Sequence, residues 1–275
     1  MKKNISLFLV IIIVLSSLIV ACGMENEANL EGEDLEVETY SLEGIKNKGK
    51  LVMGTSADYP PFEFHTMIDG KDEIVGFDIE IAKYIADELG VELEIKDMDF
   101  DKLLGGLSTG MLDIVIAGMN PDPEREANFT DIYYEANLSV LVAKENKSNI
   151  TSVEDLEGKN IGVQIGTTQE DIAQTKIKDA DVKSLSTNPD IVMNLKTKKI
   201  DCALMEAPVA ESFAKANDDI MVVEDLTIDS GTGGVAIAVK EDNDELTEKL
   251  NEILAKAKSE GLLEKWLVET DEFSN

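Results

Sequence analysis

The chain has 275 residues, 43% of them hydrophobic, and its 56 acidic and 25 basic residues give a formal net charge of −31. This excess of negative charge excludes a nucleic acid as a partner, because phosphate backbones are bound by basic surfaces. A single histidine, His65, and two cysteines exclude a multi-histidine metal site and a disulfide framework, so we expect no metal and no cofactor.

The first residues are typical of a secretory signal peptide. Lys2 and Lys3 precede an apolar run over 5–19, and small residues over 20–22 offer a cleavage site. Ile-Val-Ala-Cys at 19–22 resembles a bacterial lipobox. We therefore expect removal of residues 1–21 and lipidation of Cys22, with palmitate among the acyl chains, which anchors the chain on the extracytoplasmic face of the cell membrane. The alternative is an ordinary signal peptide cut after Ala21, which leaves Cys22 free.

Residues 22–44 are predicted to be an acidic tether without fixed structure. Residues 24–42 carry seven carboxylates, no basic residue and few large apolar groups. Such a composition cannot bury enough apolar surface to offset the entropy lost on folding. About 230 residues then remain for folding, enough for one large domain or two lobes.

The rest of the chain alternates between strand-like and helix-like patterns. Strands are predicted over 50–54, 91–95, 112–117, 160–165, 182–185, 200–205, 220–223 and 235–239. Helices are predicted over 77–89, 100–108, 168–176, 189–196, 208–216, 244–259 and 262–268. This alternation indicates an α/β fold with mainly parallel sheets.

The alternation restarts once, which predicts two lobes with a ligand cleft between them. We expect one lobe over 45–136 plus 233–275 and the other over 137–232, joined by two hinge crossings at 134–137 and 230–234. Cys202, in the apolar run 202–205, and Trp266, in the last helix, are expected to be core residues.

Five motifs, in this order and spacing, resemble the polar amino acid-binding proteins of bacterial ABC importers. They are GTSADYPPFEF (54–64), VGFDIEIAKYIADELG (75–90), DFDKLLGGLSTGMLDIVIAGM (99–119), PER (123–125) and DLEGKNIGVQIGTTQ (155–169). The resemblance implies the two-lobed type II fold of periplasmic binding proteins. It also implies a free amino acid as ligand, a membrane permease as partner, a monomer, and a role in transport rather than catalysis.

Two positions are expected to hold the ligand carboxylate. Arg125 is the only arginine in the chain. It follows the predicted strand that ends at Ala117, and Gly118 and Asn120 lie between the strand and Arg125. A guanidinium binds a carboxylate through two parallel hydrogen bonds, with the Asn120 amide and backbone N–H groups near Gly118 in support. The resemblance places the carboxylate also against Thr168, at a helix N-terminus. The alternatives are a surface ion pair for Arg125 and a simple N-cap for Thr168.

The remaining site residues come from the resemblance. It implies that Glu206 binds the α-ammonium group and that the rings of Tyr59 and Phe100 enclose the ligand side chain. The alternatives are a solvated strand-end carboxylate and two core aromatics. Three further ligand-binding positions are predicted, and they are Ser56, Ala117 and Gln164.

Selectivity and rival functions remain open from the sequence. Ser56 replaces an aspartate found in several relatives that bind glutamine or basic amino acids, while Asp58, Glu63 and Gln164 are nearby polar candidates. With one arginine available, an acidic ligand is disfavoured and a basic or neutral polar amino acid is favoured. The rival functions are an enzyme of the same fold, such as a cyclohexadienyl dehydratase-like lyase, and a ligand-sensing domain.

Overall fold

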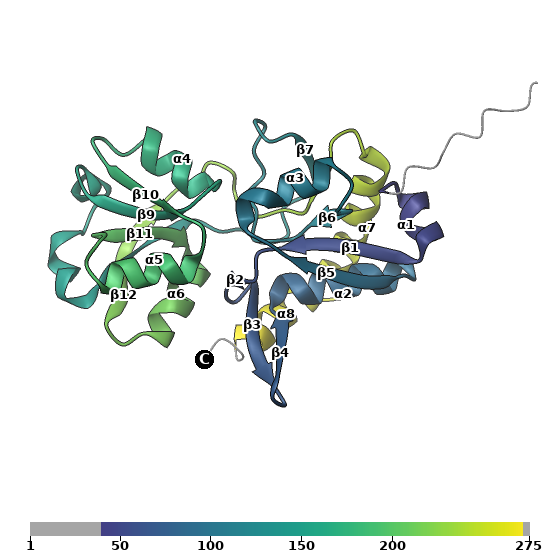
Figure 1. Ribbon diagram of the computed structural model, residues 1–275, viewed down its shortest axis with the longest axis horizontal. Coiled ribbons are helices and arrows are strands. Elements are labelled where there is room, and N and C mark those ends of the chain that lie inside the picture. The colour runs from purple at the N-terminus through teal and green to yellow at the C-terminus, as the bar shows by residue number, and fades with distance from the viewer. Residues whose placement is uncertain (1–39, 272–275) are drawn as a thin grey trace, which may run out of the picture. The chain divides into compact units, whose positions relative to one another are not determined.

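The computed structural model describes residues 40–271, without the side chains of residues 147, 148 and 271, and these residues belong to one compact unit (Figure 1). The predicted signal peptide and the lipidation site at Cys22 lie outside the described residues. Among the helices of residues 40–271, none is long and apolar enough to cross a membrane.

The first large sheet has the strand order β5-β1-β6-β13-β7. Its strands are β5 (Glu92–Asp97), β1 (Lys50–Thr55), β6 (Ile114–Val115), β13 (Ala238–Lys240) and β7 (Ala127–Phe129). The accompanying helices are α1 (Leu42–Lys48), α2 (Phe77–Leu89), η1 (Phe100–Lys102), α3 (Leu103–Ser108), α7 (Asp244–Ser259) and α8 (Leu262–Asp271). β1 is parallel to β5 and β6, whereas β13 is antiparallel to β6 and β7.

The second large sheet has the order β10-β9-β11-β8-β12. Its strands are β10 (Asp181–Leu185), β9 (Asn160–Gln164), β11 (Cys202–Glu206), β8 (Leu138–Ala143) and β12 (Ile220–Ile228). The accompanying helices are η2 (Lys144–Asn149), η3 (Val153–Leu156), α4 (Thr168–Thr175), α5 (Asn188–Lys196) and α6 (Ala207–Ala216). β8 is antiparallel to both β11 and β12.

A small third sheet connects β1 to α2. Its strands are β2 (Asp58–Tyr59), β3 (Glu63–Ile68) and β4 (Lys71–Val75), paired antiparallel in the order β2-β3-β4. We call the part built on the first large sheet and this small sheet the first lobe, and the part built on the second large sheet the second lobe (Figure 1).

Several predicted elements are confirmed. α2 has the predicted bounds because its buried face, which includes Phe77, Ile81, Ile85 and Leu89, follows a helical period. It ends at Gly90, whose left-handed backbone (φ 71°) allows its N–H to bond to the carbonyl oxygens of the last turn. α7 also has the predicted bounds. The α/β class is therefore confirmed.

Three expectations need correction. The sheets are mixed rather than mainly parallel, because the strand that follows each crossing, β8 in the second sheet and β13 in the first, runs antiparallel to its neighbours. The strand predicted over 112–117 is paired only at Ile114–Val115 within the described chain. α1 begins at Leu42, inside the segment expected to be tether, because Ser41 caps the helix and Leu42 and Ile45 are buried.

The chain passes between the two lobes twice. β8 follows the first passage, and β13 follows the second, in which Val235 pairs antiparallel with Tyr134. The Val235 N–H donates to the Tyr134 carbonyl at 2.9 Å, so the two passages are hydrogen-bonded to each other. Gly234 permits this approach: its φ is 155°, and a Cβ there would lie 2.2 Å from the Tyr134 oxygen.

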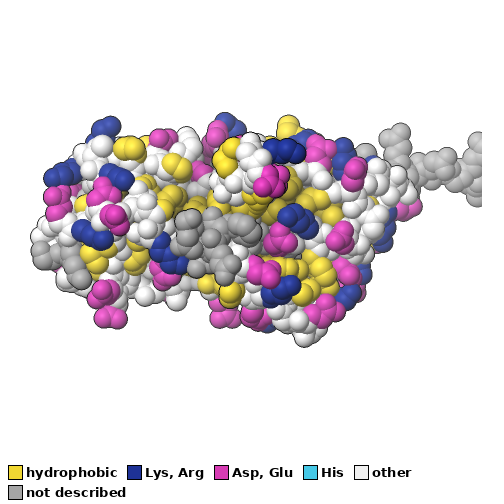
Figure 2. Space-filling view, turned by 90° about the horizontal axis from the view of Figure 1, so that it is seen from below, with side chains coloured by type: hydrophobic (Ala, Val, Ile, Leu, Met, Phe, Trp, Pro, Cys, Tyr) yellow, Lys and Arg dark blue, Asp and Glu magenta, His cyan; other side chains and the backbone are white. Residues whose placement is uncertain are grey.

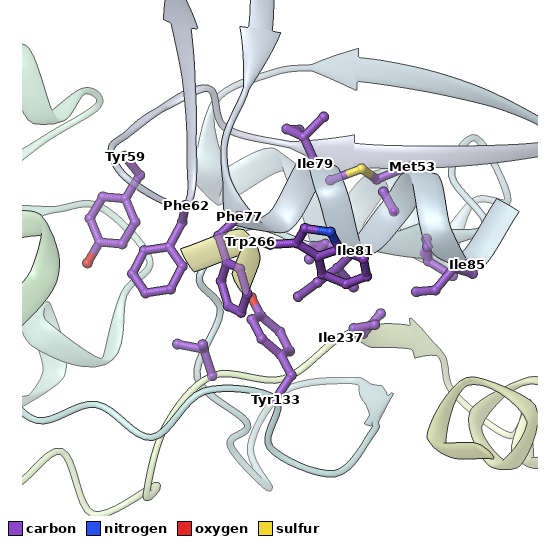
Figure 3. Close-up of a cluster of buried hydrophobic side chains, with 14 of the residues drawn as sticks. Met53, Tyr59, Phe62, Phe77, Ile79, Ile81, Ile85, Tyr133, Ile237 and Trp266 are labelled. Carbon is purple, nitrogen blue, oxygen red and sulfur yellow. The ribbon is translucent and has the colours of Figure 1, made fainter. Parts of the chain in front are cut away.

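A row of aromatic rings leads from the first-lobe loop after β1 toward the first passage (Figure 3). Tyr59 stacks on Phe62 with ring centroids 6.0 Å apart, Phe62 lies 6.1 Å from Phe77, and Phe77 lies 5.9 Å from Tyr133. All four side chains are buried. Trp266 of α8 is buried as predicted and packs against Tyr84 of α2.

The face of the molecule seen in Figure 2 carries its charge in a dispersed form. On the face seen in Figure 2, acidic side chains and basic ones are interspersed with apolar and uncharged groups instead of forming one large patch. Such a distribution is typical of a solvated surface and gives no sign of a polyanion-binding face.

Candidate functional site

Loops from both lobes meet at a small cavity. Its lining residues are Ser56, Tyr59, Glu63, Phe100, Ala117, Gly118, Asn120, Gln164, Thr167 and Gln169. Seven of these were predicted as ligand-binding residues from the sequence. The cavity volume is about 10 Å³, close to what one water molecule needs. An amino acid can therefore enter only if the lobes separate or the lining side chains move.

Glu206, at the end of β11, lies at the second-lobe side of this cavity and is 1% exposed. Its Oε2 accepts a hydrogen bond from Gln169 Nε2 at 2.5 Å, and its backbone N–H donates to the Tyr59 hydroxyl at 3.3 Å. Burial raises the pKa of Glu206 to about 8. A cation placed beside this carboxyl would stabilise its charged form, as the predicted ammonium-binding role requires.

Glu63 is a second buried carboxyl in the cavity lining, and its side chain has no solvent exposure. No N–H or hydroxyl group among residues 40–271 donates to either carboxyl oxygen, and the partner within reach is the Asp78 carboxyl. Burial and the neighbouring Asp78 carboxyl raise the pKa of Glu63 well above its ordinary value. The sequence marked Glu63 only as a nearby polar candidate. The informative signal was its place in Phe-Glu-Phe at the start of β3, where it is buried between two aromatic residues.

Asp78 fixes the backbone beneath the cavity. Its carboxylate accepts the Gly118 N–H at 2.8 Å and the Tyr133 hydroxyl at 2.9 Å. Burial raises the pKa of Asp78 to about 6 despite these bonds. The Gly118 N–H is therefore bound within the protein, although Gly118 lines the cavity as predicted. The Asn120 amide is likewise engaged, since its Nδ2 donates to the Gly234 carbonyl at 3.0 Å.

Arg125 lies beside the small cavity instead of in its lining. Its Nη2 donates to the Gly166 carbonyl at 2.9 Å, and its guanidinium lies 5.8 Å from the centre of the Phe100 ring. It lines an adjoining pocket of about 460 Å³, together with Asp101, Asp122 and other polar residues. Phe100 lines both the cavity and this pocket, so the guanidinium lies next to the cavity. Its hydrogen bond, however, goes to the Gly166 carbonyl.

Thr168 is not the N-cap of α4. That position is taken by Thr167, whose hydroxyl accepts the Glu170 N–H at 3.2 Å and donates to the Gln164 carbonyl at 2.7 Å. The Thr168 hydroxyl is buried and has no partner in the described part of the chain. The alternative of a simple cap is therefore wrong for Thr168, and its hydroxyl remains available to a ligand.

The unpaired polar atoms around the cavity are mostly hydrogen-bond acceptors. Within residues 40–271 they are the two carboxyl oxygens of Glu63, Oε1 of Glu206, Oε1 of Gln169 and the hydroxyl of Thr168. Buried acceptors without donors cost free energy, so a ligand rich in N–H groups would satisfy this site. No cluster of three or more metal-ligating side chains occurs between residues 40 and 271.

Known proteins resemble this chain over most of its length. A family model described as bacterial extracellular solute-binding proteins, family 3, matches residues 51–269. An arginine-binding extracellular protein of Bacillus subtilis (strain 168) is 39% identical, over 89% of each chain. An L-cystine-binding protein of Escherichia coli (strain K12) is 30% identical, over 84% of this chain and 89% of its own length.

A solved structure is also similar. It is an amino acid ABC transporter substrate-binding protein from Streptococcus pneumoniae Canada MDR_19A, bound to L-arginine. It is 37% identical, has a TM-score of 0.81, and the match covers 84% of this chain and 98% of that one.

Proposed function

We propose that this chain, which belongs to family 3 of the bacterial extracellular solute-binding proteins, binds a free cationic amino acid for an ABC importer and that its preferred ligand is arginine. The observation that carries this proposal is a pair of buried carboxyls: Glu63 lines the cavity, and Glu206 lies behind Gln169 of the same lining. Arginine presents an ammonium group at one end and a guanidinium at the other, which matches two separate carboxylates.

The proposed placement uses the side chains around the cavity. Glu206 binds the α-ammonium group, Glu63 binds the guanidinium, and the rings of Tyr59 and Phe100 enclose the methylene stem. Supporting this, Tyr59, Glu63 and Phe100 are buried in the cavity lining, and the buried Glu206 bonds to Gln169 and Tyr59 of that lining. The relatives described above include two that are named for or bound to arginine, which supports the same ligand.

The ligand carboxylate needs donors that reach the cavity from its rim. We propose Arg125 and Thr168 for this role. Arg125 would have to exchange its bond to the Gly166 carbonyl for the ligand carboxylate, a charged acceptor that forms stronger hydrogen bonds. Thr168 supports this role because its hydroxyl lacks a partner among the described residues.

Calorimetric titration with arginine and with citrulline tests the proposal. Citrulline has nearly the same shape as arginine but a neutral side chain, so it removes only the charge that Glu63 would bind. We expect arginine to bind and citrulline to bind about 100-fold more weakly. Equal affinities, or preference for glutamine or cystine over arginine, would contradict the assignment of a cationic ligand.

Three further statements belong to the proposal. The protein works as a monomer whose lobes, 41–136 plus 233–275 and 137–232, close on the amino acid and present it to the permease. It is a binding protein rather than an enzyme, as its transport-associated relatives support. Cys22 carries the lipid that anchors it outside the cytoplasm; a Cys22→Ala variant found in the cell-free medium, with the wild type in the membrane fraction, would support this.

A further inference from the structure

Asp58 of the first lobe bonds to the start of α5 in the second lobe. Its carboxylate accepts the backbone N–H of Asn188 at 2.9 Å and the Asn188 side-chain Nδ2 at 3.0 Å. Asn188 is the first residue of α5, and Thr187 is the N-cap of that helix. The start of a helix presents free N–H groups and a partial positive charge, so a carboxylate is favoured there.

This contact is separate from the ligand cavity. Neither Asp58 nor Asn188 is among the residues that line it, although Tyr59, next to Asp58, is. Other polar contacts between the lobes, such as Tyr59 with Glu206 and Arg125 with Gly166, use residues of the site itself. Asp58 also bonds to Gln164, which lines the cavity, so a change at Asp58 reaches the site only through that one neighbour and acts on closure through Asn188.

The loop that carries Asp58 is held in place by its own lobe. The Ala57 N–H donates to Asp97 Oδ1 at 2.9 Å, and the Asp58 N–H donates to the Ser56 carbonyl at 2.7 Å. Asp58 also pairs with Phe64 between β2 and β3. Loss of the Asp58 carboxylate would thus leave the loop in its conformation and remove the two bonds to Asn188 and the bond to Gln164, and Asn188→Ala separates the first from the second.

We propose that Asp58 is an affinity-determining residue that acts through Asn188: the two form a latch that holds the lobes closed and sets how long the ligand stays bound. The latch forms only when β2 and the start of α5 meet, so its loss destabilises the closed form relative to the open one. A ligand leaves through the open form, and the effect therefore falls on the dissociation rate more than on the association rate.

The test measures arginine dissociation by stopped flow, and its use of arginine rests on the proposed function. Asp58→Ala is expected to accelerate dissociation about 10-fold, with an association rate within about twofold of wild type. Asn188→Ala keeps its backbone N–H and should give a smaller acceleration. The double variant should be no faster than Asp58→Ala, because the second change removes a group that has already lost its partner. Glu73→Ala, on the exposed strand β4 of the same small sheet, is the matched control.

Two results would overturn the latch. One is a dissociation rate of Asp58→Ala within twofold of the control, and the other is full additivity of the two single variants. If the wild type does not bind arginine, the proposed function fails. The latch is then decided by small-angle scattering of the protein without ligand. A larger radius of gyration for Asp58→Ala than for Glu73→Ala supports it, and equal radii overturn it.

Discussion

Glu63→Gln is expected to reduce the affinity for arginine about 100-fold and to leave the affinity for citrulline nearly unchanged. The Glu63 side chain is fully buried in the cavity lining, so a guanidinium there would pair with it away from water. Losing one partner of a buried, hydrogen-bonded ion pair costs roughly 2–5 kcal/mol. Because the amide of glutamine still accepts a hydrogen bond, we expect about 3 kcal/mol, which is roughly 100-fold.

The same variant should change the pH dependence of binding. Burial and Asp78 raise the pKa of Glu63, so its carboxyl holds a proton to higher pH than an exposed glutamate does, and a guanidinium binds only the charged form as an ion pair. Higher pH favours the charged carboxylate, so arginine affinity of the wild type should rise from pH 5 to pH 8. Glutamine does not titrate, and the rise should be smaller in Glu63→Gln.

Calorimetric titration of the wild type and Glu63→Gln, each with arginine and with citrulline, separates the effect of the Glu63 charge from the effect of its shape. The four affinities form a cycle in which the ligand charge and the protein charge are removed singly and together. Glu73→Gln, an exposed residue of the same small sheet, serves as the control. An equal loss of arginine and citrulline affinity would refute the ion pair, because it would mean that Glu63 only shapes the cavity. So would arginine affinity within threefold of wild type.

Three other changes test the site and the crossings. Glu206→Gln should weaken arginine binding about 100-fold in calorimetric titrations. Because burial raises the pKa of Glu206 to about 8 in the folded protein, the carboxyl destabilises the fold increasingly as pH rises from 5 to 8, so the variant's melting temperature should exceed that of the wild type by more at pH 8 than at pH 5. Arg125→Lys keeps the charge but loses the forked geometry, so calorimetry should show about 10-fold weaker binding, whereas unchanged affinity would leave Arg125 outside the site. Gly234→Ala, whose Cβ would lie 2.2 Å from the Tyr134 oxygen, should lower the unfolding free energy by about 3 kcal/mol in urea titrations, while Gly105→Ala, which has open space, should not lower it.

The sequence was most informative where local patterns decide structure. α2 could be placed from the period of its buried residues and the glycine that ends it. α1 was missed because it is short and follows an acidic segment, and its stability comes from the Ser41 cap and burial of Leu42. The small sheet was missed because its exposed and buried residues do not alternate over a long stretch.

The site shows the same division. Residue types and motifs indicated which loops meet at the cavity, and seven predicted residues line it. The sequence could not show that Asp78 takes the Gly118 N–H, since this bond joins residues 40 positions apart. Nor could it show that Gln169 reaches Glu206, because that contact depends on how α4 sits against the end of β11.

The small sheet β2-β3-β4 has a consequence for redesign. It carries Tyr59 and Glu63 into the cavity, yet its strands belong to neither large sheet, and the two crossings lie elsewhere in the chain. Two residues proposed to contact the ligand side chain, Tyr59 and Glu63, are thus carried on one short segment between β1 and α2, which also carries Asp58 of the proposed latch. Exchange of residues 56–64 for those of a relative with another ligand is therefore the shortest route to a retargeted binding protein or biosensor.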